Sequence, residues 1–343
     1  MPPRSPIAVT MGDPAGIGPD ITLAAWQRRV ERRLPVFAVY GDPAVFAARA
    51  TQLGLSVPVR TIDEPSDATT AFADAFPVVP VAPCFEVVAG SPNVRNSAAT
   101  IAAIDDAVRV VLRGSAAGLV TCPIAKSVLY DAGFSYPGHT EYLAHLAETA
   151  AGNGQPILPV MMLASDALRV VPATIHIPLA DVAKTLTADL VRNTITITLD
   201  ALRTDFGIAK PRVAVAGLNP HAGENGTIGR EDCDLIAPVI ASLRALGHDV
   251  AGPHSADTLF HAAARRNYDA VVAMYHDQAL IPIKTLAFDS GVNITLGLPF
   301  VRTSPDHGTA FDIAGTGKAS PESFIQALLL AETIGAARAK PAA

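Results

Sequence analysis

The sequence of residues 271–317 is VVAMYHDQALIPIKTLAFDSGVNITLGLPFVRTSPDHGTAFDIAGTG, and it carries the main indications of both the fold and the site. The apolar run over 270–274 has the length and composition of a buried strand, and the polar sequence YHDQ follows where that strand would end. Lys284, Asn293 and Arg302 come next. Because ligands in an open α/β sheet bind outside the carboxyl ends of the strands, this stretch predicts a site for an anionic ligand, with a metal as a further candidate.

The composition favours a compact globular protein. The chain has 343 residues, enough for two domains, with 50% hydrophobic and 17% charged residues. Its net charge of −6 argues against nucleic-acid and membrane partners. No apolar run reaches membrane-spanning length, and the N-terminal sequence is not that of a signal peptide. The widely spaced Cys84, Cys122 and Cys233 suit a reducing compartment, so we expect a cytoplasmic protein.

Strand-like and helix-like segments alternate along the chain, which predicts an α/β fold with a largely parallel sheet covered on both faces. Thr140 is the expected N-cap of one helix, and residues 60–90, rich in Pro and Asp, are expected to be mostly connection. The predicted strands cover 7–10, 35–40, 118–122, 159–163, 168–174, 212–218, 270–274 and 292–296, and the predicted helices cover 19–29, 43–53, 96–113, 138–148, 181–202, 233–246 and 321–339.

A glycine-rich segment, MGDPAGIGP over residues 11–19, connects the first strand to the first helix. A loop of this kind before a helix N-terminus can hold an anion. However, its glycine spacing is not that of a dinucleotide-binding Rossmann fingerprint, and the chain has no phosphate-binding P-loop. A tight structural turn is therefore at least as well supported as a ligand contact.

Three histidines have the same sequence context. His176, His221 and His276 each follow an apolar, strand-like run, and they are separated by one or two strand–helix units. Adjacent parallel strands would bring their ends together, and three imidazoles at one point are typical of a metal site. The alternative is that each is an unrelated loop or core histidine, but the repeated placement favours the metal.

Lys284 and Arg302 lie in an apolar stretch that is otherwise poor in charge, around the strand that contains Asn293. A Lys and an Arg together suit a phosphate or carboxylate, whereas each alone would be read as a solvated surface charge. His139, beside a predicted helix N-terminus, is equally compatible with an anion contact and with a solvated loop position.

Six motifs carry a family resemblance over nearly the whole chain: TMGDPAGIGPD, PGHTEYLA, TIHIPL, GLNPHAGENG, YHDQALIPIK and GVNITLGLPFVRTSPDHGTAFDIAG. In this order they resemble the motifs of the 4-hydroxythreonine-4-phosphate dehydrogenase family of pyridoxal 5′-phosphate biosynthesis. The resemblance implies an isocitrate/isopropylmalate-dehydrogenase-like fold with two α/β/α domains and a cleft between them. We expect residues 1–128 plus 300–343 to form the first domain and residues 129–299 the second. One local departure is Cys122 in TCPIAK, where a smaller residue is expected.

The resemblance also implies roles for individual residues. It implies a homodimer with an active site shared between subunits, to which the partner contributes His276. It implies NAD or NADP as cofactor and one divalent ion, zinc, magnesium or cobalt, in each site. The implied metal ligands are His176, His221 and His276, the implied substrate-binding residues are His139, Thr140, Lys284, Asn293 and Arg302, and the implied cofactor-binding residues are His307, Gly308 and Asp312.

The implied reaction is oxidation of the C3 hydroxyl of 4-phosphooxy-L-threonine, followed by loss of carbon dioxide. Asp257 and Lys284 are both candidates for the general base, and the sequence does not choose between them. Two alternatives remain open. One is a related dehydrogenase for a four-carbon sugar-acid phosphate or a dihydrodiol dicarboxylate, and the other is a non-catalytic binding protein that retains the pocket.

Overall fold

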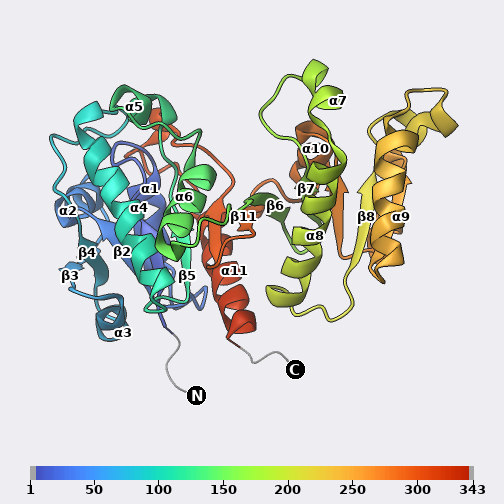
Figure 1. Cartoon of the computed structure of the whole chain (residues 1–343). Coiled ribbons are helices and arrows are strands. Elements are labelled where there is room, and N and C mark those ends of the chain that lie inside the picture. Colours follow the sequence, from blue (N-terminus) through green and yellow to red (C-terminus); the bar gives the residue numbers. More distant parts are fainter. Residues whose placement is uncertain (1–4, 340–343) are drawn as a thin grey trace. The chain divides into compact units, whose positions relative to one another are not determined.

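The computed structural model describes residues 5–339 and divides into two compact units (Figure 1). The first contains residues 5–159 and 298–339, and the second contains residues 160–297. The expected boundary after residue 128 is thus corrected to one after residue 159. Helix α6 (His139–Ala151) explains the difference, because its Leu143 and Ala147 join the same apolar core as Ala103 and Ala107 of α4 (Ser97–Leu112).

The first unit is built on parallel strands. All residues of β1 (Ile7–Thr10), β2 (Phe37–Gly41) and β5 (Gly118–Thr121) are buried, as expected for strands covered by helices on both faces. The strand order is β3 (Val59–Thr61), β4 (Phe76–Pro80), β2, β1, β5, β12 (Arg302–Pro305). The helices are α1 (Gly18–Gln27), α2 (Pro43–Gln52), α3 (Ala68–Ala71), α4, α5 (Lys126–Asp131), α6 and α11 (Glu322–Arg338).

Two local predictions for this unit were wrong. Residues 60–90 contain most of the edge strand β3 and all of β4, which the sequence analysis treated as connection. Strand β3 has three residues, and β4 begins and ends near prolines, so neither shows a strand pattern long enough to recognise. Thr140 is not the cap of α6: the helix starts at His139, Gly138 is the N-cap, and no side chain caps it.

The second unit contains a mixed sheet. Its order is β11 (Val292–Leu296), β6 (Val160–Ala164), β7 (Arg169–Pro172), β10 (Ala270–Ala273), β8 (Arg212–Ala216), β9 (Asp249–His254). Strand β6 is antiparallel to both of its neighbours, whereas β7, β10, β8 and β9 are parallel. The expectation of a largely parallel sheet therefore holds except around β6. The helices are α7 (Val182–Thr185), α8 (Ala188–Thr204), α9 (Ala237–Ala245) and α10 (His276–Ala287).

The glycines of the segment 11–19 serve close backbone packing. A Cβ on Gly12, whose φ is +74°, would lie 2.5 Å from the carbonyl oxygen of Pro123. A Cβ on Gly18 would lie 3.2 Å from the Cβ of Cys122, whose side chain is buried. This supports the interpretation of the segment as a tight structural turn, and Cys122 fills the space that the two glycines leave.

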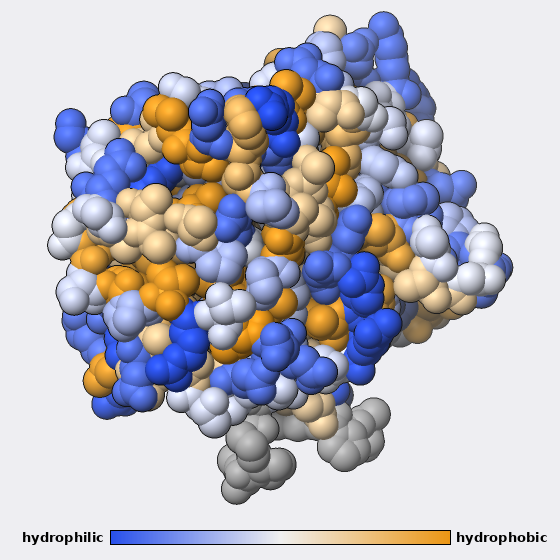
Figure 2. All heavy atoms as spheres, turned by 90° about the vertical axis from the view of Figure 1, so that its left-hand side faces the viewer, coloured by the Kyte–Doolittle hydropathy of each residue, from blue (hydrophilic) through white to orange (hydrophobic). Residues whose placement is uncertain are grey.

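The structure confirms the α/β class. Figure 2 shows the face at the left of Figure 1, beside β3 and β4, where hydrophobic and hydrophilic side chains are interspersed. Among residues 5–339, no helix combines the length and the apolar character needed to cross a bilayer.

Candidate active site

The three histidine-bearing strands are neighbours in the second unit. Strand β10 pairs in parallel with β7 on one side and with β8 on the other. His176 lies four residues after β7, His221 five residues after β8, and His276 three residues after β10 as the first residue of α10. All three histidines therefore follow the carboxyl ends of adjacent strands, as the sequence predicted.

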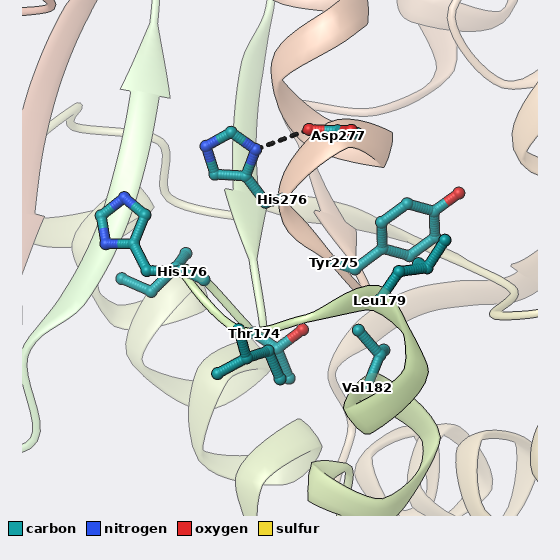
Figure 3. Close-up of a pocket in the computed structure, with 9 residues that line it drawn as sticks. Thr174, His176, Leu179, Val182, Tyr275, His276 and Asp277 are labelled. Atoms are coloured by element: carbon teal, nitrogen blue, oxygen red, sulfur yellow. Dashed lines mark hydrogen bonds and ion pairs between the residues drawn. The ribbon is translucent and has the colours of Figure 1, made fainter.

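His176 and His276 face each other across one pocket (Figure 3). Their ring centroids are 5.7 Å apart, and the rings are inclined by 44°. Nδ1 of His276 lies 2.7 Å from Oδ1 of Asp277, a hydrogen bond that fixes the ring and leaves Nε2 for a ligand. The pocket is lined by Thr174, Ile175, His176, Ile177, Leu179, Val182, Tyr275, His276 and Asp277.

The separation of these two rings is compatible with two ligands of one metal ion. Two imidazoles on one tetrahedral Zn²⁺, with bonds of about 2.0–2.1 Å, have ring centres about 5–6 Å apart. However, no three His, Cys, Asp or Glu side chains within residues 5–339 lie close enough together to hold a metal ion. The convergence of all three histidines within a single chain, which their spacing favoured, is therefore not found.

His221 lies in an unusual backbone segment. Residues 221–225 all have positive φ, between 42° and 76°, so the chain makes a left-handed turn between Pro220 and Gly226. His176 also has a positive φ, 51°. A left-handed conformation costs a residue other than glycine on the order of 1–3 kcal/mol and is concentrated at functional sites. Two of the three candidate ligands are thus held in strained backbone.

Asp257 lies beside His221 and is exposed. Its pKa is lowered mainly by the hydroxyl of Ser255, which donates a 2.5 Å hydrogen bond to Oδ1, and also by the nearby His221. A carboxylate with a lowered pKa stays ionised and is a weak base near neutral pH. The geometry therefore fits Asp257 better as a charged neighbour of His221 than as the general base.

Basic groups gather in the first unit around Arg302, the first residue of β12. The guanidinium is buried, and its Nη2 and Nε donate to the Thr121 hydroxyl at 2.7 and 3.2 Å. Burial lowers the pKa of Arg302 to about 10. Burial, followed by the charges of Arg302 and Lys126, holds the pKa of His139 well below its usual value. The carboxylate of Glu141 acts on Arg302 in the direction that raises its pKa, and the remaining positive charge of Arg302 and Lys126 favours a bound anion.

The imidazole of His139 supports the same interpretation. Its Nε2 is buried and has no hydrogen-bond partner within the described residues. Because a buried polar atom without a partner is costly, this nitrogen is suited to a ligand. Lys126 and Thr121 were not among the predicted site residues, although both belong to the segment TCPIAK at the end of the predicted strand 118–122. Thr140 follows His139 in the first turn of α6.

The two other predicted substrate residues belong to the second unit. Lys284 is on α10, with its Nζ 5.5 Å from the ring centroid of Phe288, and Asn293 is on β11 opposite Leu163. Both side chains are half-buried. The structure places them within the same unit as His176, His221 and His276.

The predicted cofactor residues lie in the loop over 307–315. His307 Nδ1 is 3.1 Å from the Gly308 carbonyl oxygen, and Asp312 is exposed. A hydrogen bond holds the end of this loop: the Gly315 N–H donates to the Asp20 carboxylate at 2.7 Å. Asp20 in turn forms a buried ion pair with Arg49. No sequence pattern indicates this pair, because Asp20 belongs to α1 and Arg49 to α2.

Comparisons with known proteins agree with these features. Residues 33–331 match the family model described as pyridoxal phosphate biosynthetic protein PdxA. A 4-hydroxythreonine-4-phosphate dehydrogenase of Methylorubrum extorquens is 55% identical over 331 residues, which are 96% of this chain and 94% of that protein.

Two solved structures are also similar. The crystal structure of 4-hydroxythreonine-4-phosphate dehydrogenase from Klebsiella pneumoniae is 39% identical, with a TM-score of 0.84 over 96% of this chain and 99% of that one. A terephthalate 1,2-cis-dihydrodiol dehydrogenase from Burkholderia xenovorans is 32% identical, with a TM-score of 0.65 over 96% of this chain and 98% of that one.

Proposed function

Because the chain belongs to the PdxA family of pyridoxal phosphate biosynthetic proteins, we propose that it oxidises 4-phosphooxy-L-threonine with NAD or NADP and a divalent metal ion. Identity of 55% to a curated 4-hydroxythreonine-4-phosphate dehydrogenase over nearly the full chain makes it an oxidoreductase rather than a non-catalytic binding protein. The substrate, the cofactor, the metal and the decarboxylation are the parts of this proposal that need experiments.

The basic cluster around Arg302 is the observation that carries the choice of substrate. A phosphate monoester is close to doubly charged at neutral pH, and it presents several acceptor oxygens. The Arg302 guanidinium, the Lys126 ammonium and the unpartnered Nε2 of His139 are suited to such a group. Thr140 is proposed as a further contact in the first turn of α6, where main-chain N–H groups favour an anion.

The metal is proposed to bind His176, His221 and His276. The 5.7 Å separation and the bond from His276 to Asp277 fit this role. A divalent ion held there, zinc, magnesium or cobalt, would supply Lewis acidity toward the C3 hydroxyl and the carbonyl that replaces it. His176 and His276 of one chain fit together on one ion, so His221 is proposed to come from the partner subunit. The division implied by the family resemblance instead groups His176 with His221.

A homodimer accounts for the missing third ligand and for exposed apolar side chains in the second unit. Ile281 and Phe288 are 63% and 73% exposed, and their spacing puts them on one side of α10. Leu179, 71% exposed, lines the pocket of His176 and His276. A partner subunit that covers these side chains would remove their apolar surface from water and bring a histidine to the same pocket.

Oxidation at C3 gives 2-amino-3-oxo-4-phosphooxybutanoate, a β-keto acid, which loses carbon dioxide to give 3-amino-2-oxopropyl phosphate. The nicotinamide cofactor supplies the hydride acceptor, and His307, Gly308 and Asp312 are the proposed contacts for it. Lys284 and Asn293 are proposed to bind and orient the substrate. Because Asp257 has a lowered pKa, Lys284 is the better candidate to take the hydroxyl proton.

A substrate comparison tests this proposal. Initial rates of NADH formation would be measured with 4-phosphooxy-L-threonine, with unphosphorylated 4-hydroxythreonine, with a four-carbon sugar-acid phosphate and with a cis-dihydrodiol dicarboxylate. We expect kcat/KM to be highest for 4-phosphooxy-L-threonine, with one carbon dioxide released per NADH. A higher kcat/KM for either of the last two compounds would replace the proposed substrate, and carbon dioxide release that does not match NADH would remove the decarboxylation.

A further inference from the structure

Hydrogen bonds to the backbone of Met274 connect the segment that carries His176 to the segment that carries His276. Met274 is fully buried, directly follows β10 and precedes His276 by two residues. Its carbonyl oxygen accepts hydrogen bonds from the Thr174 hydroxyl at 2.8 Å and from the Thr174 N–H at 3.2 Å. Because Thr174 precedes His176 by two residues, these bonds fix the segment of His176 against that of His276.

A single side chain, Gln278, connects the same point to the segment of His221. Its Oε1 accepts from the Met274 N–H at 2.7 Å, and its Nε2 donates to the Gly217 carbonyl oxygen at 2.7 Å. Gly217 directly follows β8 and precedes His221 by four residues. The backbone pairing of β8 with β10 ends at Val215 and Val272, so Gln278 continues the connection beyond the last strand pair.

Hydrogen bonds to Asp232 also restrain the backbone between Gly217 and His221. The buried carboxylate of Asp232 accepts from the Leu218 N–H at 2.8 Å and from the Asn219 N–H at 3.1 Å. A displacement of Gly217 is therefore transmitted to the left-handed turn that carries His221, because the intervening residues have little freedom to absorb it. The two hydrogen bonds of Gln278 thus join the segments that follow β8 and β10.

We propose that Gln278 is a positioning residue for the metal site, which sets the place of His221 relative to His176 and His276. This role rests on the proposed function, since it assumes that the three histidines bind metal. Gln278 itself is not a ligand in this account: both ends of its amide are used by the Met274 N–H and the Gly217 carbonyl. Because His221 is proposed to serve the partner subunit's site, the same two bonds set the position at which His221 reaches that site.

Two variants and one matched control separate positioning from general stability. Gln278→Met keeps the volume and removes both hydrogen bonds, whereas Gln278→Glu keeps the acceptor for Met274 and removes the donor to Gly217. The control is Asp269→Asn. Asp269 joins the opposite ends of the same two strands, because it precedes β10 and accepts from the Arg212 N–H at 2.8 Å and from its Nη2 at 3.0 Å.

The readouts are the affinity of the metal-free protein for Co²⁺, measured against a chromophoric chelator, the visible spectrum of bound Co²⁺, and the Tm of the metal-free protein. We expect both Gln278 variants to weaken Co²⁺ binding by about 10- to 100-fold and to change the Co²⁺ spectrum. Asp269→Asn should lower the Tm but leave the affinity and the spectrum as in the wild type.

Wild-type affinity and spectrum in the folded Gln278→Met and Gln278→Glu proteins would overturn the proposal. Equal weakening by Asp269→Asn at an equal loss of Tm would also overturn it, because the effect would then be general destabilisation. A wild-type protein that binds no Co²⁺ would instead remove the proposed metal site, and the role of Gln278 with it.

Discussion

The buried guanidinium of Arg302 is suited to binding an anionic ligand. It donates to the neutral hydroxyl of Thr121, and burial lowers its pKa to about 10. The charge of Glu141 acts in the opposite direction, but burial outweighs it, so a desolvation cost remains that a bound anion can offset. Lys126 contributes a second positive charge, which together with that of Arg302 lowers the pKa of His139. The cluster is therefore expected to gain most from a ligand with two negative charges.

We predict that Arg302→Ala raises KM for 4-phosphooxy-L-threonine by roughly 10- to 100-fold, because a hydrogen bond to a charged group is worth about 1.5–3 kcal/mol. Arg302→Lys keeps the charge without the planar fork, so its loss should be smaller. Steady-state kinetics measure both. Any detectable turnover of unphosphorylated 4-hydroxythreonine should hardly change, and equal losses for the two substrates would assign Arg302 to another role.

His139 should make stability depend on pH. Its pKa is lower in the folded protein than its ordinary value of 6.5, so the unfolded chain binds the proton first as the pH falls. The folded state therefore loses stability below about pH 6.5. Urea unfolding of wild type and His139→Gln at about pH 7.5 and 5.5 should show a smaller loss in the variant, with the exposed His261→Gln as control. The same loss in wild type and in His139→Gln would contradict the lowered pKa.

At the scale of single elements, the sequence predicted what depends on local pattern. The apolar runs before His176, His221 and His276 are strands β7, β8 and β10, and the helix that begins near His139 is α6. What it missed depends on contacts between distant segments. Lys126 joins the basic cluster only because α5 and α6 pack in the same unit, and no spacing in the sequence shows this.

The turn from Pro220 to Gly226 is a second element that pattern did not reveal. The sequence PHAGENG contains residues that tolerate positive φ, but six successive positive values, over residues 221–226, require the support of Asp232 and the packing around Gly223. Glu224 is exposed and adopts a φ of 42°. This left-handed conformation is therefore expected to lower the stability of the folded state, within the same turn that carries His221.

We predict that Glu224→Gly stabilises the protein. Glycine removes a left-handed penalty of about 1–2 kcal/mol and adds about 0.5–1 kcal/mol of unfolded-state entropy, so the net gain is on the order of 0.5–1 kcal/mol. Thermal unfolding should show a Tm higher by about 1–2 °C. Thr227→Gly, at φ −77°, should instead lower the Tm. A lower Tm in Glu224→Gly would show that the turn is not strained.

At the scale of the whole molecule, the sequence predicted two units but misplaced their boundary, because α6 packs on α4 through contacts distant in sequence. It also left open whether three histidines meet within one chain. His176, His221 and His276 follow the ends of adjacent strands. Among the residues that the structure describes, the rings of His176 and His276 lie close together, and no third ligand joins them. In the proposed homodimer the third ligand comes from a partner subunit, which a pattern within one chain does not reveal.

Mixed dimers test how the ligands are shared. His176→Ala, His221→Ala and His276→Ala should each be nearly inactive alone. If His221 comes from the partner subunit, pairing His221→Ala with either of the other two gives one complete site in each mixed dimer. Random pairing makes about half the dimers mixed, so activity should return to about a quarter of wild type. His176→Ala paired with His276→Ala should recover nothing.

The division implied by the family resemblance predicts a different pattern. With His176 and His221 from one chain, pairing His176→Ala with His276→Ala restores activity, whereas pairing His176→Ala with His221→Ala does not. Mass spectrometry of the mixtures controls for subunit exchange. Recovery in none of the three mixtures, with exchange demonstrated, would contradict a shared site.

The central claim is that this chain oxidises a phosphorylated hydroxy amino acid at a metal site built from His176, His221 and His276. The most direct measurement is NADH formation from 4-phosphooxy-L-threonine by protein stripped of metal with a chelator and then titrated with Zn²⁺, Mg²⁺ or Co²⁺. We predict no activity in the stripped protein, recovery that saturates at one ion per subunit, and no recovery in His276→Ala at any of these metal concentrations. Full activity in protein verified to be free of metal would contradict the claim.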